Sequence, residues 1–213
     1  MVVRIRKYRK SDRNAVRKIC CDTGFLGNPI DKIFQDRELW ADALTSYYTD
    51  KEPDSIYVAE ESGKVVGYIF GCRISWREEG YVKRNALKWI IRLFWRYTTN
   101  KYNRKTKDFV KYLLFHSKGQ IPKVPRNYAH LHINVMEGKR YKGTGKRLMN
   151  IYFKYLKTYG VAGVYLQTFE FPGAPAYRFF KSFGFRVYDR VESHLWAKHF
   201  NKKIYLTTMI KSL

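Results

Sequence analysis

One segment constrains the fold of this chain more than any other: residues 128–159, where an expected strand passes through a glycine-containing turn directly into an expected helix. Residues 128–136 alternate apolar and polar side chains, which predicts a strand. Residues 146–159 are predicted to be helical because their apolar side chains share one face: Leu148, Met149, Tyr152, Tyr155, Leu156 and Tyr159. A strand, turn and helix in this order are typical of a domain that combines a sheet with covering helices.

The turn itself reads Arg140-Tyr141-Lys142-Gly143-Thr144-Gly145. The first turn of a helix has unpaired N–H groups and a partial positive charge, so an anion placed there gains hydrogen bonds and a favourable dipole. Glycine lets a ligand approach the backbone and permits positive φ. Lys142, Lys146 and Arg147 add positive charge, so the segment indicates a phosphate site, although the same glycines could simply turn the chain.

The rest of the chain supplies more strands and helices in alternation. Strands are predicted over residues 2–8, 55–60, 64–72, 161–169, 185–191 and 204–210, and helices over 11–21, 37–48 and 174–183. Glu61-Ser62-Gly63 joins two of the strands as a hairpin. We therefore expect an α/β (α+β) fold with a mixed sheet, formed as a single domain over residues 1–213.

Residues 73–126 differ from this pattern, since they hold 15 Lys or Arg and three acids and carry no strand pattern. They are interpreted as a basic insertion with helices over 82–97 and 107–115. In the first helix Arg84, Lys88, Arg92 and Arg96 form a ridge, opposite an apolar stripe of Leu87, Ile90, Ile91, Phe94 and Trp95. The simplest expectation is that the stripe packs on the domain and the ridge is solvated; a membrane surface and nucleic acid are alternative partners.

Charge and cysteine content restrict the function classes. The net charge of +24 would attract nucleic acid, anionic lipid, acidic proteins or a polyanionic cofactor, without choosing among them. The three cysteines, Cys20, Cys21 and Cys72, indicate neither a disulfide framework nor a zinc site, and no metal site is expected. With no signal-peptide or membrane-span pattern, a cytoplasmic protein is expected.

Two motifs together resemble a known family. The segment Arg140–Gly145 resembles the pyrophosphate loop, R/Q-x-x-G-x-G/A, of the GNAT N-acetyltransferases, in its expected place after the fourth strand. Residues 177–185 are similar to the helix and Gly-Phe signature of the same family. Residues 19–24 and 128–134 further resemble acetyltransferase-like proteins related to the C-terminal domain of bacterial O-GlcNAcases. The resemblance implies a GNAT-like, mostly antiparallel central sheet flanked by helices, with the basic insertion between strands 3 and 4.

The resemblance also implies the chemistry. An acetyl-CoA-dependent N-acetyltransferase would pass the acetyl group directly from the thioester to a primary amine of an acceptor that the sequence does not identify. The strand backbone would pair with pantetheine, and an N–H near residues 133–135 would stabilise the oxyanion. The residues expected to bind this co-substrate are Asn134, Val135, Met136, Arg140, Tyr141, Lys142, Gly143, Thr144, Gly145 and Lys146.

Deprotonating an alkyl amine at pH 7 costs about 4 to 5 kcal/mol, so a base is useful. The candidates, in order, are His132, Glu170 and His130, against the simpler role of a structural histidine or a solvated acid. The family's usual tyrosine acid is replaced by Phe180, and Tyr177, three residues upstream, is the substitute candidate. Phe180 leaves open a coenzyme-A-binding pseudoenzyme, and the charge leaves open a nucleic-acid or membrane-surface module on the same fold.

Overall fold

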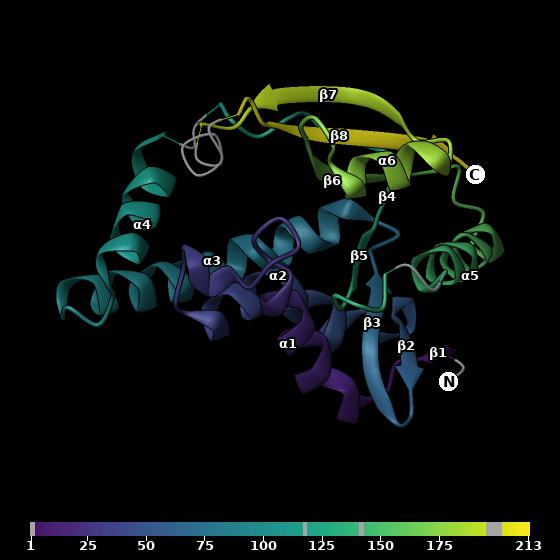
Figure 1. Ribbon diagram of the computed structural model, residues 1–213, viewed down its shortest axis with the longest axis horizontal. Coiled ribbons are helices and arrows are strands. Elements are labelled where there is room, and N and C mark those ends of the chain that lie inside the picture. Colours follow the sequence, from purple (N-terminus) through teal and green to yellow (C-terminus); the bar gives the residue numbers. More distant parts are fainter. Residues whose placement is uncertain (1–2, 117–118, 141–142, 195–201) are drawn as a thin grey trace.

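The computed structural model describes residues 3–116, 119–140, 143–194 and 202–213. Its strands form two four-stranded sheets, with helices on both sides of the first (Figure 1). The helices are α1 (Arg13–Asp22), α2 (Arg37–Lys51), α3 (Ser75–Thr98), α4 (Arg104–His116), α5 (Thr144–Thr158) and α6 (Pro175–Ser182). Every helix predicted from the sequence is present, and the expected combination of sheets and covering helices is confirmed.

The first sheet is antiparallel throughout, in the order β1-β2-β3-β5. Its strands are β1 (Arg4–Lys7), β2 (Tyr57–Glu61), β3 (Lys64–Phe70) and β5 (His132–Val135). The predicted hairpin between β2 and β3 turns at Ser62 and Gly63, which both have positive φ. Positive φ at both residues gives a two-residue turn whose twist matches that of the flanking strands.

The second sheet contains the one parallel pair of the described strands, between β4 and β6. Its order is β4-β6-β8-β7, formed by β4 (Ala129–His130), β6 (Gly163–Glu170), β8 (Tyr205–Ser212) and β7 (Arg186–Glu192).

The strand predicted over 128–136 is divided between the two sheets. At the division, the His130 amide donates to Cys72 O at 2.9 Å and the Leu131 amide donates to Tyr165 O, also at 2.9 Å. Beyond Leu131 the chain continues beside β3 as β5 and leaves β6. The two sheets therefore part at this residue.

Helix α5 lies over the junction of the sheets. Its buried face packs against apolar residues of both, including Ile69 of β3 and Leu166 of β6. Five of the six residues predicted in its stripe are buried: Leu148, Met149, Tyr152, Tyr155 and Leu156. The sixth, Tyr159, lies beyond the end of α5 and is exposed. The burial of this face fixes the start of α5 relative to the gap between the sheets.

Helices α1 and α2 cover the opposite face of the first sheet. There Val16, Ile19 and Tyr48 pack against Tyr68 and Phe70 of β3. Cys72, expected in the core, is fully buried beside them, and burial raises the pKa of its thiol. Among the described helices, none has the length and hydropathy needed to cross a membrane.

Helix α3 presents a different side to the protein from the one its sequence predicted. Trp89, Leu93 and Tyr97 pack against the cluster formed by α2 and α4, while the predicted apolar stripe is exposed: Leu87, Ile90, Ile91, Phe94 and Trp95. The expectation that the stripe packs on the domain was wrong.

The reason lies in Asp36, whose side chain is only 2% exposed at the N-terminus of α2. Two members of the supposedly solvated ridge pair with it: Arg92 Nη2 lies 2.7 Å from Asp36 Oδ1 and Arg96 Nη1 lies 3.4 Å from Oδ2. The Tyr102 hydroxyl also donates to this carboxylate, at 2.8 Å. A buried carboxylate needs such partners, so the charge, and not the stripe, sets the rotation of α3.

Candidate active site

The start of α5 is built to receive an anion. Gly143 precedes the helix with φ of 71°, and the first helical hydrogen bond runs from the Arg147 amide to Gly143 O at 3.1 Å. The amides of Thr144, Gly145 and Lys146 therefore have no partner within the helix. Three N–H groups and the helix dipole point to the same place.

The Thr144 side chain adds an unused hydroxyl to this group. It is fully buried, and its Oγ1 has no hydrogen-bond partner within the described residues. Gly145 is required for packing, because a Cβ there would lie 3.1 Å from Cζ of Phe179 on α6. A buried hydroxyl beside three amides that have no partner among the described residues fits the oxygens of a diphosphate, which would satisfy these donors.

The basic residues of the turn are arranged less simply than the sequence predicted. Tyr141 and Lys142 lie outside the described residues, and Lys146 is exposed. Arg147, expected to add charge to an anion, instead donates to Val3 O at the start of the chain. Arg140 donates from Nε to Val135 O at 3.0 Å and from Nη2 to Gly27 O at 2.8 Å. It joins the edge of β5 to the loop after α1.

Within the described residues, the edge of β5 that faces the second sheet pairs with no other strand beyond Leu131. The Met136 amide donates to Val66 O of β3 at 2.9 Å, and backbone directions alternate along a strand. The backbone N–H and C=O groups of Ile133 and Val135 therefore point to the other edge of β5. On that edge, the Leu131 amide bonds to Tyr165 of β6. Of the three residues expected to pair with pantetheine, Val135 has its backbone toward the gap, whereas Asn134 and Met136 have theirs toward β3.

A polar and aromatic network lies on the α1–α2 face of the junction. Asn134 Nδ2 lies 2.9 Å from the Tyr68 hydroxyl and 3.0 Å from His132 Nε2, so it can donate to both. The His132 ring stacks on Phe70, with 5.1 Å between the ring centroids. His130 Nδ1 lies 2.8 Å from the Tyr48 hydroxyl. The two histidines thus share one face, as the strand alternation predicted.

Both histidines are neutral at pH 7. Burial lowers the pKa of His132 to about 4. Burial also lowers the pKa of His130 to about 3, and the neighbouring His132 contributes to the shift. Tyr48 is fully buried, and its pKa is raised by burial and by Glu78 of α3. Burial raises the pKa of Glu78 in turn.

The other two catalytic candidates, Glu170 and Tyr177, lie together on the face of the second sheet that is opposite to the histidines. Glu170, at the end of β6, accepts from the Thr207 hydroxyl at 2.9 Å and from Arg190 Nη1 at 3.2 Å. Glu170 and Leu166 are four residues apart in β6, so their side chains point to the same face of the sheet, the one that α5 and α6 cover. Burial and the Glu170 carboxylate raise the pKa of Tyr177. Glu170 and Tyr177 are brought together, but away from His132.

Phe180, at the position of the family's tyrosine, is buried in the core against Phe179 and Phe185. Sequence reasoning missed Tyr48, Tyr68 and Glu78 as parts of the histidine network. Aromatic residues on an apolar stripe are usually core residues, and Glu78 lies in the insertion, so no local signal separated them from their neighbours.

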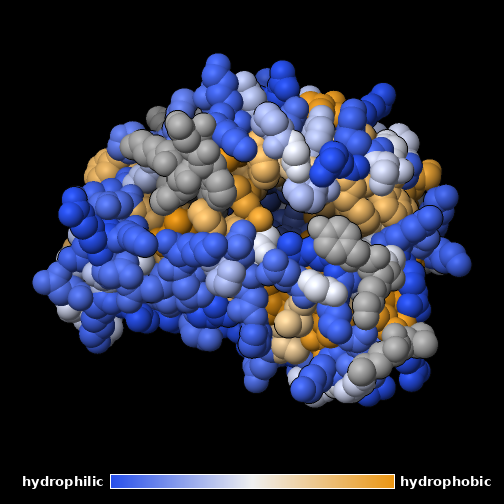
Figure 2. All heavy atoms as spheres, in the orientation of Figure 1, coloured by the Kyte–Doolittle hydropathy of each residue, from blue (hydrophilic) through white to orange (hydrophobic). Residues whose placement is uncertain are grey.

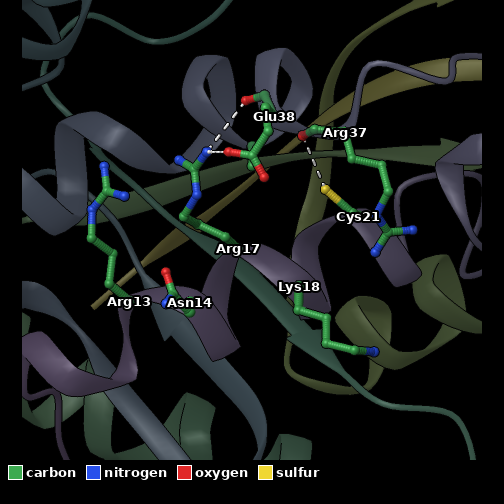
Figure 3. A pocket seen from close by; sticks show the side chains of 8 residues that line it. Arg13, Asn14, Arg17, Lys18, Cys21, Arg37 and Glu38 are labelled. Atoms are coloured by element: carbon green, nitrogen blue, oxygen red, sulfur yellow. Dashed lines mark hydrogen bonds and ion pairs between the residues drawn. The ribbon is translucent and has the colours of Figure 1, made fainter.

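A second hollow, of about 390 Å³, lies between α1 and α2 and is lined by basic residues (Figure 3). Its cations are already paired with acids of the same protein. Arg17 contacts Asp42 at 2.7 Å and Glu38 at 2.6 Å. Arg37 pairs with Asp22 and Asp31, each at 2.5 Å. The charge here is locally balanced, which makes this hollow a weaker anion site than the start of α5.

Two further observations concern metal ligands and the molecular surface. In the described part of the chain, no three His, Cys, Asp or Glu residues gather in a way that could hold a metal ion. In the space-filling view, mostly hydrophilic side chains cover the end of the molecule formed by α4, while apolar side chains reach the surface near the middle (Figure 2).

Comparison with known proteins agrees with this geometry. A profile of the acetyltransferase (GNAT) family matches residues 27–185. The crystal structure of SsHAT superposes with a TM-score of 0.72 at 26% identity, covering 100% of this chain and 98% of that one. A search of curated proteins gave no match.

Two more distant structures share the fold. The yncA protein of Salmonella typhimurium, solved with its cofactor acetyl-CoA, has a TM-score of 0.59 at 18% identity, covering 100% of this chain and 95% of that one. Ard1 from Thermoplasma volcanium has a TM-score of 0.57 at 18% identity, covering 100% and 99%. The profile match spans most of the chain, including the start of α5 and the strands β4 and β5 on either side of Leu131, and the chain therefore belongs to the GNAT family of N-acetyltransferases, EC 2.3.1.-.

Proposed function

We propose that this protein transfers an acetyl group directly from acetyl-CoA to a primary amine. The single observation that supports this most is the gap after Leu131, which leaves the outer edge of β5 beside the free amides of α5. The diphosphate of coenzyme A would bind Thr144, Gly145 and Lys146. Its pantetheine arm would then extend along the strand edge at Val135.

This placement requires an adjustment at Arg140. Its Nε now donates to Val135 O, the acceptor that an added pantetheine amide would use. Pantetheine would replace this bond or share the carbonyl, which has two lone pairs. The guanidinium released in this way would remain close enough to the turn to pair with phosphate.

The reaction itself needs one base, one oxyanion donor and one acid. The amine nitrogen attacks the thioester carbonyl, the carbon–sulfur bond breaks, and the thiolate of coenzyme A takes a proton. The outward amide of Ile133 or Val135 would donate to the oxyanion. Tyr177 remains the proposed acid, because Phe180 has no proton to give.

His132 remains the first proposed base, supported by its neutral state and its place on the α1–α2 face. A pKa near 4 means that it would hold the amine proton only briefly. No hydrogen bond between described groups joins His132 to the His130–Tyr48 pair, so an onward path through Tyr48 would require a bridging water. Glu170 fits this role less well, since its carboxylate already accepts hydrogen bonds from Arg190 and Thr207.

A second candidate, a protein that binds coenzyme A without catalysis, is favoured by one observation alone: the buried Phe180 in place of the usual acid.

Within the family, the residues 19–24 and 128–134 are the basis for proposing kinship with the acetyltransferase-like proteins related to bacterial O-GlcNAcases. The acceptor amine is not identified by either observation.

Calorimetric titration with acetyl-CoA tests the proposal. Gly143→Asp places a carboxylate at the phosphate position, where nothing lies within 4 Å of a Cβ. Gly160→Asp is the matched control, because Gly160 has a similar φ of 65° and equal open space at the other end of α5. We expect wild type and Gly160→Asp to bind and Gly143→Asp to lose binding. Equal binding by all three, or none by wild type, would contradict the proposal.

A further inference from the structure

We propose that the outward face of α3 binds the surface of an anionic lipid bilayer. The face consists of large apolar side chains at helical spacing, and they are strongly exposed: Leu87 by 68%, Ile90 by 58% and Phe94 by 66%. Ile91, Trp76 and Trp95 extend the same exposed surface. Soluble proteins rarely expose so continuous an apolar patch without a binding role.

The fold holds this face outward. Turning α3 to bury the stripe would separate Arg92 and Arg96 from Asp36, a carboxylate that is almost fully buried. It would also remove Trp89, Leu93 and Tyr97 from the cluster between α2 and α4. Leaving a buried charge unpaired costs several kcal/mol, so the exposure is a stable property of the protein.

An apolar groove continues the surface toward α4. It has a volume of about 230 Å³, and Ile90 of the exposed face forms part of its wall. The other lining residues are Phe34, Leu39, Trp40, Ala43, Leu44, Trp89, Leu93, Phe109 and Leu113. The groove could accept part of an acyl chain, which a flat apolar patch could not.

Basic side chains flank the apolar face. Lys83, Arg84 and Lys88 are exposed on the same helix. At about 100° per residue, Lys83 falls within the apolar stripe, while Arg84 and Lys88 are the part of the ridge nearest to it. The chain as a whole carries a net charge of +24. Lysine and arginine beside an apolar helix face suit the headgroups of an anionic membrane, each contributing about 1 kcal/mol near the surface.

The same charges argue against other occupants. A second copy of the chain would bring another +24 to the interface, which repulsion disfavours. Nucleic acid would use the cations and could stack bases on Trp76, Phe94 and Trp95, but it would leave the aliphatic side chains of the face, such as Leu87, Ile90 and Ile91, without apolar partners. A lipid surface satisfies both the charged and the aliphatic side chains.

Co-sedimentation of the full chain with vesicles tests the proposal. We expect binding to phosphatidylcholine vesicles that contain phosphatidylserine, none to phosphatidylcholine alone, and a blue shift of tryptophan emission from Trp76 and Trp95. The triple variant Leu87→Ser/Ile91→Ser/Phe94→Ser should bind at least about tenfold more weakly. Val187→Ser/Tyr188→Ser, which changes exposed apolar residues of β7, should bind like wild type.

A charge series gives a second test that does not depend on the apolar variant. Reversal of Lys83, Arg84 and Lys88 to Glu should weaken binding more than the same reversal of the exposed Lys51, Lys64 and Lys154. No binding to phosphatidylserine vesicles, or equal binding by the apolar variant, would overturn the proposal. A dimer or a complex with poly(U) RNA that the apolar variant loses, without vesicle binding by wild type, would assign the face to those partners. Acetyl-CoA titration of the same variants should remain unchanged, so this proposal can fail without the transferase proposal.

Discussion

Helices α5 and α3 each carry an apolar stripe of large side chains, yet the fold buries the first and leaves the second in solvent. On α5, Leu148, Met149 and Tyr152 are fully buried over the junction of the sheets. On α3, the stripe around Leu87 is exposed and two arginines of the opposite ridge turn inward. Amphipathic spacing identifies a helix and its faces, but the side that packs depends on what the rest of the fold offers.

The difference comes from the surfaces that receive the two helices. The sheets present α5 mainly with apolar residues, such as Ile69 and Leu166, and with no buried charge in that cluster. The segment before α2 presents α3 with Asp36, held in place because it also accepts from the Leu39 amide at 3.1 Å. Burial alone would raise the pKa of Asp36, but hydrogen bonds from Tyr102, Leu39 and Arg92 keep it below its usual value.

The largest expected contrast is between one leucine of each helix. Leu148→Ala should lower the free energy of unfolding by about 3 kcal/mol, because it leaves a cavity in a fully buried position. Leu87→Ala should change it by less than about 0.5 kcal/mol. Urea unfolding followed by circular dichroism measures both. Similar losses for the two variants would mean that the α3 stripe is buried after all.

A slightly smaller effect is expected at Asp36. Asp36→Asn leaves Arg92 and Arg96 without their acid, and should cost about 2 to 3 kcal/mol, less than for a fully buried pair because both arginines are about a third exposed. Asp50→Asn, which breaks the exposed pair with Arg13, should cost under about 1 kcal/mol. The same unfolding experiment gives both values, and equal values would remove the electrostatic explanation for the rotation of α3.

The pH dependence of the free energy of unfolding should come from His130 and His132, on the α1–α2 face of the sheet junction. His130 and His132 have lowered pKa values in the folded protein, so below about pH 6.5 the unfolded chain binds protons that the folded chain does not. Stability should therefore fall as the pH decreases from about 6.5 to 4, with less than the full slope because both rings are only partly buried. His130→Gln should flatten the curve of unfolding free energy against pH. His116→Gln, at an exposed ring on α4, should leave it unchanged; the opposite result would contradict the burial of His130.

The smallest expected effects have opposite signs in the two helices. Gly80→Ala in α3 should stabilise the protein by up to about 1 kcal/mol, since the new Cβ would meet only the end of Arg84, at 3.4 Å. Gly145→Ala in α5 should destabilise it by about 1 kcal/mol, because the Cβ would press on the Phe179 ring at 3.1 Å. Thermal unfolding distinguishes the signs, and stabilisation by Gly145→Ala would argue against close packing of α5 on α6.

The sequence was sufficient for most of the fold because local signals agreed with the global structure. The hairpin at Ser62-Gly63 and the helix start at Gly143 both depend on residues that permit positive φ, and both were predicted. The division of the strand at Leu131 was not predicted. Alternation continues unbroken from 129 to 135, so it contains no sign that the hydrogen-bond partners change from one sheet to another.

The candidate site was predictable to the extent that it is contiguous in sequence. The glycines and Thr144 follow one another in the chain, whereas the histidine network joins Tyr48, Tyr68 and Asn134 from three separate elements. Nor could the sequence tell that Glu170 and His132 lie on opposite faces, because that depends on which sheet each strand enters. Arg147 was assigned to the anion site by its position, but its side chain reaches Val3 O instead.

The most direct test of the central claim is a nuclear magnetic resonance titration of amide-labelled protein with acetyl-CoA. The account predicts the largest shifts at the amides of Ile133, Val135, Thr144, Gly145 and Lys146, with little change along the exposed face of α3. Shifts concentrated on α3 and α4, or in the hollow between α1 and α2, would contradict the placement of coenzyme A between the parted sheets.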